Sequence, residues 1–214
     1  MKKHLFVVVT TLAALSIATG PVAAAGDYQA GKTKSAACLA CHGVDGNSLV
    51  PTFPKIAGQS ASYIVKQLKA FKTKQRIDET MNGQVQSLNE QDMADLAAYF
   101  SQQSVQPGSG NSELMGVGKQ LYEKGNIKAR VFACKGCHGF KGAGNHDLLQ
   151  SINASTIVEA PALSGQHPAY IVKQLKAFQS KTRSNDVGKI MQNLAEGMTE
   201  QDIQAVAEYI TALH

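Results

Sequence analysis

The chain contains an internal repeat, and this repeat constrains the fold more than any other feature of the sequence. The nine residues Tyr63–Phe71 return unchanged as Tyr170–Phe178. The motif Cys-x-x-Cys-His-Gly also occurs twice, at residues 38–43 and 134–139. Duplicated packing of a single helix does not explain two different motifs repeated in the same order. Because such self-similarity marks a repeated structural unit, we expect two domains of similar plan.

The segment between the two copies has the composition of a linker. Residues 104–112 are polar and contain Pro, Gly and Ser, which is typical of connecting segments. We therefore predict an N-terminal domain at residues 26–103, a linker at 104–112 and a C-terminal domain at 113–214. Domains of this length lie at the small end of the usual range.

Residues 1–25 have the features of a secretory signal peptide. The chain starts with two lysines, continues through a short apolar stretch and reaches Ala23-Ala24-Ala25, a small-residue cleavage site. The apolar stretch is shorter than the about 20 residues that a membrane-spanning helix needs. We expect export, cleavage after Ala25 and no membrane span in the mature protein; an uncleaved N-terminal anchor is the alternative.

The charge of the chain is small. Loss of Lys2 and Lys3 with the signal peptide lowers the formal net charge from +5 to +3. A charge of this size gives no indication of nucleic-acid binding. The charged share of 17% is also too low for a disordered polyelectrolyte.

Apolar residues recur with helical spacing in both halves, and no stretch shows the alternation typical of a strand, so the expected fold class is all-α. Each half is predicted to contain three helical stretches, the first a short helix that carries Gly31 or Gly118. Ser60 is placed to cap the second stretch, and Asn89 precedes the third. The apolar faces of the second and third stretches comprise Ile64, Leu68, Phe71, Met93, Leu96 and Phe100, and in the second half Ile171, Leu175, Phe178, Ile203, Val206 and Ile210.

All four cysteines lie in the two Cys-x-x-Cys-His motifs, and this motif is the attachment signature of c-type haem. Two thiols three positions apart on a helical turn can each add to one vinyl group of the porphyrin. The adjoining histidine then lies under the ring, where it can bind iron as the proximal ligand. The sequence predicts two covalently bound haem c groups, with thioether bonds from Cys38, Cys41, Cys134 and Cys137 and iron ligation by His42 and His138.

Three other uses of paired cysteines are the alternatives. A thioredoxin-like dithiol would follow a strand in a βαβ unit, and neither half has one. A zinc site would place its two cysteine pairs roughly 15–20 residues apart, far closer than Cys41 and Cys134. The third alternative is a disulfide within each motif, although four cysteines are too few for a disulfide-dense secreted scaffold.

The composition agrees with a bound cofactor. Only 6% of the residues are aromatic and Trp is absent, so two small domains would be short of apolar core. A large planar apolar group in each domain would make up this shortage.

Methionine is the expected sixth iron ligand. When the last helices of the two halves are aligned, Met81 and Met191 occupy equivalent positions in a non-periodic segment before the helix. Met93 and Met198 have no methionine at the equivalent positions and are expected in the core. A thioether opposite a histidine suits haem iron and raises its reduction potential. We predict Met81 and Met191 as axial ligands; two flexible core methionines are the alternative.

The other histidines are weaker ligand candidates. His167 aligns with Ser60 at a helix start, which favours a capping or solvent-exposed role. His146 lies in a longer loop of the second half, at residues 139–160, and His214 is terminal. Exposed single histidines usually have no metal role.

Two further features repeat between the halves. Pro54 and Pro161 are equivalent, and a backbone carbonyl of this segment is a candidate acceptor for the proximal imidazole N–H; an ordinary loop proline is the alternative. Several lysines lie off the apolar helix faces, where a solvated surface is expected and a docking patch for an acidic partner is the alternative: Lys66, Lys69, Lys72, Lys173 and Lys176.

Over essentially its whole mature length, the chain resembles the dihaem cytochromes of the cytochrome c4 family. In the first half the resemblance is carried by residues 38–48, 53–59 and 66–68, and in the second half by 165–167 and 170–175. It implies two tandem class I cytochrome c domains, related by a pseudo-two-fold axis, with their haem edges close. It also implies ligation by His42 with Met81 and by His138 with Met191, with the proximal histidines held by the carbonyls of Pro54 and Pro161.

The functional implication of this resemblance is a periplasmic electron carrier and not an enzyme. Such a carrier would move single electrons between a quinol-oxidising membrane complex and terminal oxidases or other acceptors. A loose association with the membrane is left open. Two alternatives remain: a dihaem subunit of a larger dehydrogenase, such as a flavocytochrome, and a dihaem enzyme of the peroxidase type. The longer loop at 139–160 departs from the family pattern.

Overall fold

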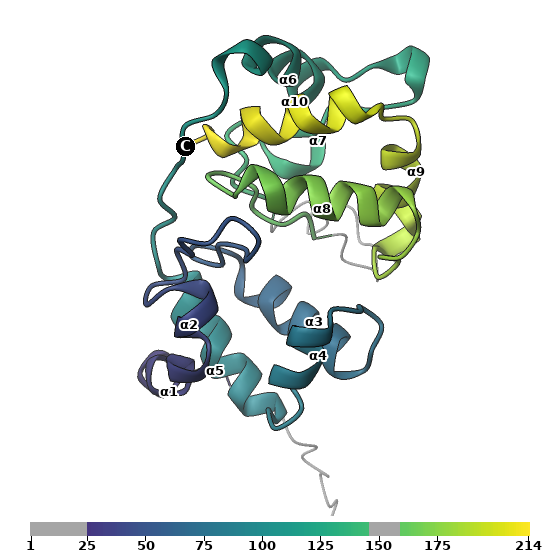
Figure 1. Ribbon diagram of the computed structural model, residues 1–214. Coiled ribbons are helices and arrows are strands. Elements are labelled where there is room, and N and C mark those ends of the chain that lie inside the picture. Colours follow the sequence, from purple (N-terminus) through teal and green to yellow (C-terminus); the bar gives the residue numbers. More distant parts are fainter. Residues whose placement is uncertain (1–24, 146–158) are drawn as a thin grey trace, which may run out of the picture.

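A computed structural model describes residues 25–145 and 159–214 (Figure 1). The predicted signal peptide, apart from Ala25, lies outside these residues, as does His146. The described residues contain helices and no strand, apart from isolated bridges of Asn126 with Val131 and Asn145 with Ala160, so the predicted all-α class is confirmed. Within the same residues, no helix is both long and apolar enough to cross a membrane.

The N-terminal half is built around two long helices, α3 and α5, which pack against each other. A shorter helix, α1, also packs along α5. The elements in chain order are α1 (Tyr28–Lys34), the 3-10 turn η1 (Ser35–Ala37), α2 (Leu39–His42), α3 (Ala61–Lys72), α4 (Glu79–Gln84) and α5 (Glu90–Ser101).

The C-terminal half repeats this arrangement: α10 packs against both α6 and α8, and α9 packs against α8. In Figure 1 the two halves lie one above the other. The elements are α6 (Ser112–Lys124), η2 (Ile127–Ala129), α7 (Lys135–His138), α8 (Pro168–Gln179), η3 (Val187–Lys189), α9 (Ile190–Glu196) and α10 (Glu200–Thr211).

The prediction of three helical stretches per half was incomplete. It missed the four-residue helices α2 and α7, which hold the cysteine motifs, and the short helices α4 and α9. These helices have four to seven residues, and an apolar period of 3.6 is hard to recognise over so short a length. The three predicted stretches of each half are confirmed, including the seven-residue helix α1.

Helices α3 and α5 start at the capping side chains that the sequence predicted. The Ser60 hydroxyl accepts a hydrogen bond from the Tyr63 backbone N–H at 3.0 Å. Asn89 and Asp92 form a capping box, each side chain accepting from the other's backbone N–H at 2.9 Å. Such caps satisfy backbone donors that a helix start leaves unpaired.

Each half has its own apolar core, and the two cores differ in size. The buried cluster of the N-terminal half comprises Ile64, Leu96, Ala97, Tyr99 and Phe100. That of the C-terminal half comprises Leu121, Tyr122, Val131, Ile171, Leu175, Met198, Ile203, Val206, Ala207 and Ile210. Met93 and Met198 are 2% and 5% exposed, which confirms their predicted core role.

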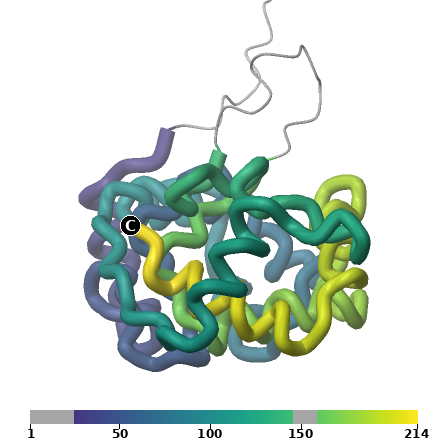
Figure 2. The backbone as a smooth tube through the Cα atoms, turned by 90° about the horizontal axis from the view of Figure 1, so that it is seen from above, coloured from purple at the N-terminus to yellow at the C-terminus, as the bar shows by residue number. Residues whose placement is uncertain are grey.

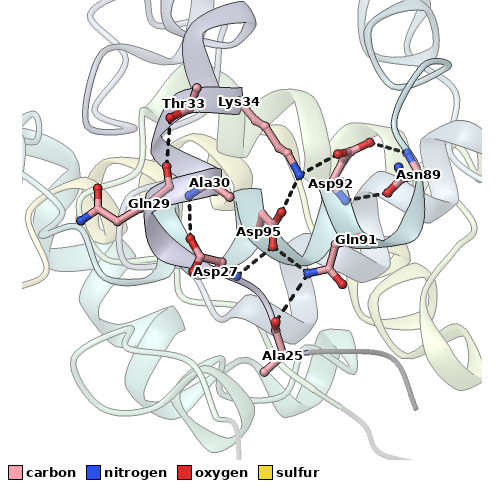
Figure 3. A network of polar contacts seen from close by, with 10 residues as sticks. All are labelled: Ala25, Asp27, Gln29, Ala30, Thr33, Lys34, Asn89, Gln91, Asp92 and Asp95. Carbon is pink, nitrogen blue, oxygen red and sulfur yellow. Dashed lines mark hydrogen bonds and ion pairs between the residues drawn. The ribbon is translucent and has the colours of Figure 1, made fainter. Parts of the chain in front are cut away.

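A buried carboxylate, Asp95 of α5, ties the start of α1 to α5 (Figure 3). Its Oδ1 accepts from the Asp27 backbone N–H and from Gln91 Nε2, both at 2.8 Å, and its Oδ2 accepts from Lys34 Nζ. The hydrogen bond from the Asp27 backbone, together with the Lys34 ammonium, lowers the pKa of Asp95 to about 2. Ala205 occupies the equivalent position in the C-terminal half and carries no carboxylate.

Replacing Asp95 with asparagine should lower the free energy of unfolding of the N-terminal half by about 2 kcal/mol near neutral pH. Because folding lowers the pKa of Asp95 from 3.8 to about 2, its contribution is complete above the unfolded value and is lost as the pH falls through the folded one. Urea unfolding of the wild type and Asp95→Asn across the acid range measures this. The difference between them should shrink toward low pH, and a constant difference would contradict the pairing.

Each half has one arginine whose side chain donates hydrogen bonds to the other half. Arg76 of the N-terminal half donates from Nη2 to Tyr170 Oη and to Gln174 Oε1 of the C-terminal half, both at 2.8 Å. Arg183 of the C-terminal half donates from Nη2 to Tyr63 Oη of the N-terminal half at 2.9 Å. Both guanidinium groups are buried. The reciprocal contacts agree with the predicted pseudo-two-fold relation.

The lysines on α3 and α8 are solvated as expected, but three of them also form ion pairs. Lys69 pairs with Glu90, Lys176 with Glu200, and Lys173 with Asp78 of the other half, at 2.8, 2.7 and 3.0 Å. The lysine side chains are 47–56% exposed, so each pair contributes little to stability.

The connection between the halves runs along one side of the molecule without helical structure over residues 104–111 (Figures 1 and 2). It is hydrogen-bonded to both halves. The Gln106 N–H donates to Asn47 Oδ1 at 2.8 Å, and the Gly108 N–H donates to the Thr211 carbonyl at 3.0 Å. These contacts fix the path of the connection on the surface.

Candidate functional site

One helical turn in each half gathers two thiols and an imidazole. In α2 the His42 N–H donates to the Cys38 carbonyl at 2.9 Å, so Cys41 and His42 lie one turn after Cys38. In α7 the His138 N–H donates to the Cys134 carbonyl, also at 2.9 Å. The structure therefore gives both predicted motifs the same local geometry.

Each histidine of these motifs is held through one ring nitrogen. His42 Nδ1 lies 2.9 Å from the Pro54 carbonyl oxygen, and His138 Nδ1 lies 2.9 Å from that of Pro161. Since a carbonyl only accepts, Nδ1 is the donor, and the lone pair of a neutral imidazole is then on Nε2. This confirms the predicted carbonyl acceptors and excludes the reading of Pro54 and Pro161 as ordinary loop prolines.

Burial favours the neutral form of both imidazoles. Each is only 7% exposed, and burial lowers the pKa of His42 and of His138, while the hydrogen bonds to the proline carbonyls oppose this effect. A neutral imidazole with a fixed tautomer is the form that binds a metal ion. The histidines therefore fit the proximal position of a haem.

Neither motif has the properties of a redox dithiol or a zinc site. No disulfide bond joins any of the four cysteines. Burial raises the pKa of Cys38 and raises that of Cys134 to about 12, whereas reactive dithiols have a lowered pKa. The described part of the chain also contains no group of three or more His, Cys, Asp or Glu residues arranged to hold a metal ion.

The two candidate methionine ligands occupy equivalent places, but in helices and not in the non-periodic segment that we predicted. Met81 lies in α4, where its N–H donates to Asp78 Oδ1 at 3.2 Å. Met191 lies in α9, where its N–H donates to Asp186 Oδ2 at 2.9 Å. Both side chains are partly buried. Met191 packs against the C-terminal core together with Cys134.

His167 occupies the N-cap position of α8, at the helix start where it was predicted, but its side chain makes no capping hydrogen bond. Instead, Nε2 lies 2.9 Å from the Ser48 carbonyl oxygen of the other half. Gln59 and Gln166, for which the sequence predicted no role, form contacts between the halves. The repeat could have drawn attention to these glutamines. Pro54 and Pro161 are each followed five positions later by a glutamine that is preceded by glycine, as Gly58-Gln59 and Gly165-Gln166.

The donor set of each half fits a covalently attached haem. Two thiols separated by one turn, a buried imidazole with a free Nε2 lone pair and a thioether are the groups by which c-type haem is attached and ligated. The chain contains only 6% aromatic residues and no Trp, which leaves a role for a large apolar cofactor.

Known proteins match both halves of the chain. The cytochrome c domain family matches residues 28–104 and 117–214. Cytochrome c4 of Pseudomonas aeruginosa is 42% identical over 197 residues, which cover 92% of this chain and 93% of that protein. The crystal structure of reduced recombinant cytochrome c4 from Pseudomonas stutzeri has a TM-score of 0.81 and 40% identity, and covers 89% of this chain and 100% of that chain.

A more distant relative is named for a different redox partner. The thiosulfate dehydrogenase electron acceptor of Stutzerimonas stutzeri strain A1501 is 33% identical over 177 residues, which cover 81% of this chain and 77% of that protein. The nearer matches extend over both halves and confirm the prediction of two tandem cytochrome c domains. The chain therefore belongs to the cytochrome c4 family of dihaem electron-transfer cytochromes, and it carries two covalently attached haem c groups.

Proposed function

We propose that the protein is a periplasmic carrier of single electrons and not an enzyme. It would accept electrons from a quinol-oxidising membrane complex and deliver them to terminal oxidases or other acceptors. The domains at 26–103 and 113–214 would each hold one haem, after removal of a signal peptide at 1–25. The observation that carries the proposal is the duplicated buried histidine, held at Nδ1 by a proline carbonyl, in a chain of the cytochrome c4 family.

The ligand set follows from these residues. Cys38 with Cys41, and Cys134 with Cys137, would form the thioether bonds. His42 with Met81, and His138 with Met191, would occupy the two axial positions of each iron. When bound, each haem supplies a one-electron couple of iron. Because each iron would be held by two of the chain's own side chains, neither would be open to a substrate, which argues against the peroxidase alternative.

The chain's own residues keep the ligands in place during electron transfer. The Pro54 and Pro161 carbonyls fix the orientation of the two imidazoles. Asp78 and Asp186 accept from the backbone at Met81 and Met191 and so anchor the start of α4 and α9. Rigid ligands suit an electron carrier, because little rearrangement accompanies the change in iron charge.

A second candidate function differs only in the electron donor. The relative described as a thiosulfate dehydrogenase electron acceptor favours a role as the redox partner of a dehydrogenase. The sequence left open that the protein is a dihaem subunit of a larger dehydrogenase. In this second candidate function, it would instead be a separate protein that accepts electrons from the dehydrogenase. Electron transfer by two haems is common to both candidates.

Replacing Met81 or Met191 with alanine tests the ligand set. Each change should abolish the sulfur-to-iron charge-transfer band of one oxidised haem and lower the reduction potential of that haem, because a thioether favours reduced iron. Visible spectra and a spectroelectrochemical titration measure both effects. Met93→Leu and Met198→Leu are the controls and should keep both bands, since these methionines are core residues. Unchanged bands in Met81→Ala or Met191→Ala would overturn the assignment.

A further inference from the structure

One peptide group connects His42 with the opposite half of the molecule. The carbonyl of Pro54 accepts from His42 Nδ1 at 2.9 Å. The N–H of the same peptide group belongs to Lys55 and donates to Gln166 Oε1 at 2.9 Å. Gln166 Nε2 donates back to the Lys55 carbonyl at 2.8 Å, so the side chain is held at two points. Gln166 is 8% exposed, which protects these contacts from water.

The mirror arrangement exists in the other direction. The carbonyl of Pro161 accepts from His138 Nδ1 at 2.9 Å, and the N–H of that peptide group, on Ala162, donates to Gln59 Oε1, also at 2.9 Å. Gln59 Nε2 donates to the Ala162 carbonyl at 3.0 Å. Each half therefore supplies a glutamine that binds the peptide group holding the other half's histidine.

The two ends of a peptide group are electronically connected. The C–N bond has partial double-bond character. When the peptide N–H donates a hydrogen bond to a glutamine Oε1, the carbonyl oxygen of the same peptide group therefore becomes more negative. A more negative oxygen accepts more strongly from the imidazole Nδ1–H, and this raises the basicity of the ligand nitrogen. A more basic axial imidazole stabilises oxidised iron relative to reduced iron and so lowers the reduction potential.

We propose that Gln166 and Gln59 are crosswise positioning residues. Gln166 of the C-terminal half lowers the reduction potential of the haem bound by His42, and Gln59 of the N-terminal half lowers that of the haem bound by His138. Contact between the halves is then part of what sets each potential. This inference rests on the histidine ligation given under the proposed function.

The test measures the potential of each haem in the full-length holoprotein carrying Gln166→Met or Gln59→Met. Methionine fills a similar volume but cannot accept from the peptide N–H. To follow one haem at a time, the variants are also made in Met191→Ala and Met81→Ala backgrounds, where one charge-transfer band remains. Spectroelectrochemical titration then follows that band.

Gln166→Met should raise the potential of the haem bound by His42 and leave the other haem nearly unchanged. The equilibrium between reduced and oxidised haem should shift by about tenfold or less, because Gln166 acts through an intervening peptide group and loss of a direct partner of a metal ligand costs roughly 10–100-fold. Gln59→Met should give the reverse pattern. In the reduced protein, the NMR resonance of the His42 Nδ1 proton should move upfield in Gln166→Met and stay in place in Gln59→Met.

A matched control separates this role from simple loosening of the interface. His167→Ala removes the contact to the Ser48 carbonyl between the halves, but touches neither proline peptide. This variant should leave the reduction potentials of both haems nearly unchanged. Gln166→Glu should bring the potential of the haem bound by His42 back to or below the wild-type value, because its carboxylate still accepts from the Lys55 N–H.

Three results would overturn the inference: unmoved potentials, equal shifts of both haems, or shifts matching those of His167→Ala. If Gln166→Met does not fold, Gln166→Glu still decides the question. A potential above the wild-type value together with an upfield shift of the His42 Nδ1 proton in Gln166→Glu would contradict the role of the peptide group. A protein without c-type haem absorbance would instead overturn the proposed ligation. A normal haem spectrum with unmoved potentials would overturn only the crosswise role.

Discussion

Replacing Cys38 and Cys41 together with alanine should remove one of the two haem groups and unfold the N-terminal half. Among the described residues, this half has ten buried apolar residues, against fourteen in the C-terminal half. A domain of this size buries too small a fraction of its surface to be stable without additional support. The covalent haem is that support, and ligands that bind only the folded state stabilise it.

The equivalent change in the other half is the matched control. The C-terminal half has more buried apolar residues, so Cys134→Ala with Cys137→Ala should lose one haem but retain more of its helical structure. The haem-to-protein ratio from absorbance, circular dichroism and limited proteolysis compare the two variants. Cleavage confined to residues 26–103 is expected for the first variant. A variant with one haem, full helical content and wild-type resistance to proteolysis would contradict this account of the core.

Features that depend on local sequence were predictable. The starts of α3 and α5 followed from Ser60 and Asn89, because a capping side chain acts within three residues of its own position. The repeat separated Met81 and Met191 from the other methionines, and Met93 and Met198 are indeed buried in the cores. The role of the Pro54 and Pro161 carbonyls was within reach for the same reason, since equivalent residues serve equivalent sites.

Contacts between the halves were not predictable in the same way. Arg76 and Arg183 were not singled out, although they are buried and reach into the opposite half. Long polar residues are usually exposed, and a single sequence does not show which charged side chain will be enclosed. His167 was misread for a related reason: its alignment with Ser60 suggested a cap, but its partner, the Ser48 carbonyl, lies in the other half. Such roles are set by how two domains meet.

Replacing Gly118 with alanine should destabilise the C-terminal half by about 3 kcal/mol, because α6 crosses α10 too closely for any side chain. A Cβ at Gly118 would lie 2.1 Å from the Ala205 carbonyl oxygen and 2.8 Å from Tyr209 Cβ. The first of these atoms belongs to the backbone of α10 and cannot move without separating the helices. This cost outweighs the about 1 kcal/mol by which alanine favours a helix over glycine. The melting temperature should fall by roughly 10–20 °C for a domain of this size.

Gly116 gives the control on the same helix. A Cβ there would meet no atom within 4 Å, so Gly116→Ala should gain helix propensity and raise the melting temperature by a few degrees. The N-terminal half offers a comparable pair on two different helices. A Cβ at Gly31 in α1 would lie 1.9 Å from the Asp95 carbonyl oxygen, whereas a Cβ at Gly83 in α4 would meet no atom within 4 Å. Calorimetry of the four alanine variants compares the pairs. Similar melting temperatures within a pair would show that the helix crossings tolerate a methyl group and that the repeated glycines serve another purpose.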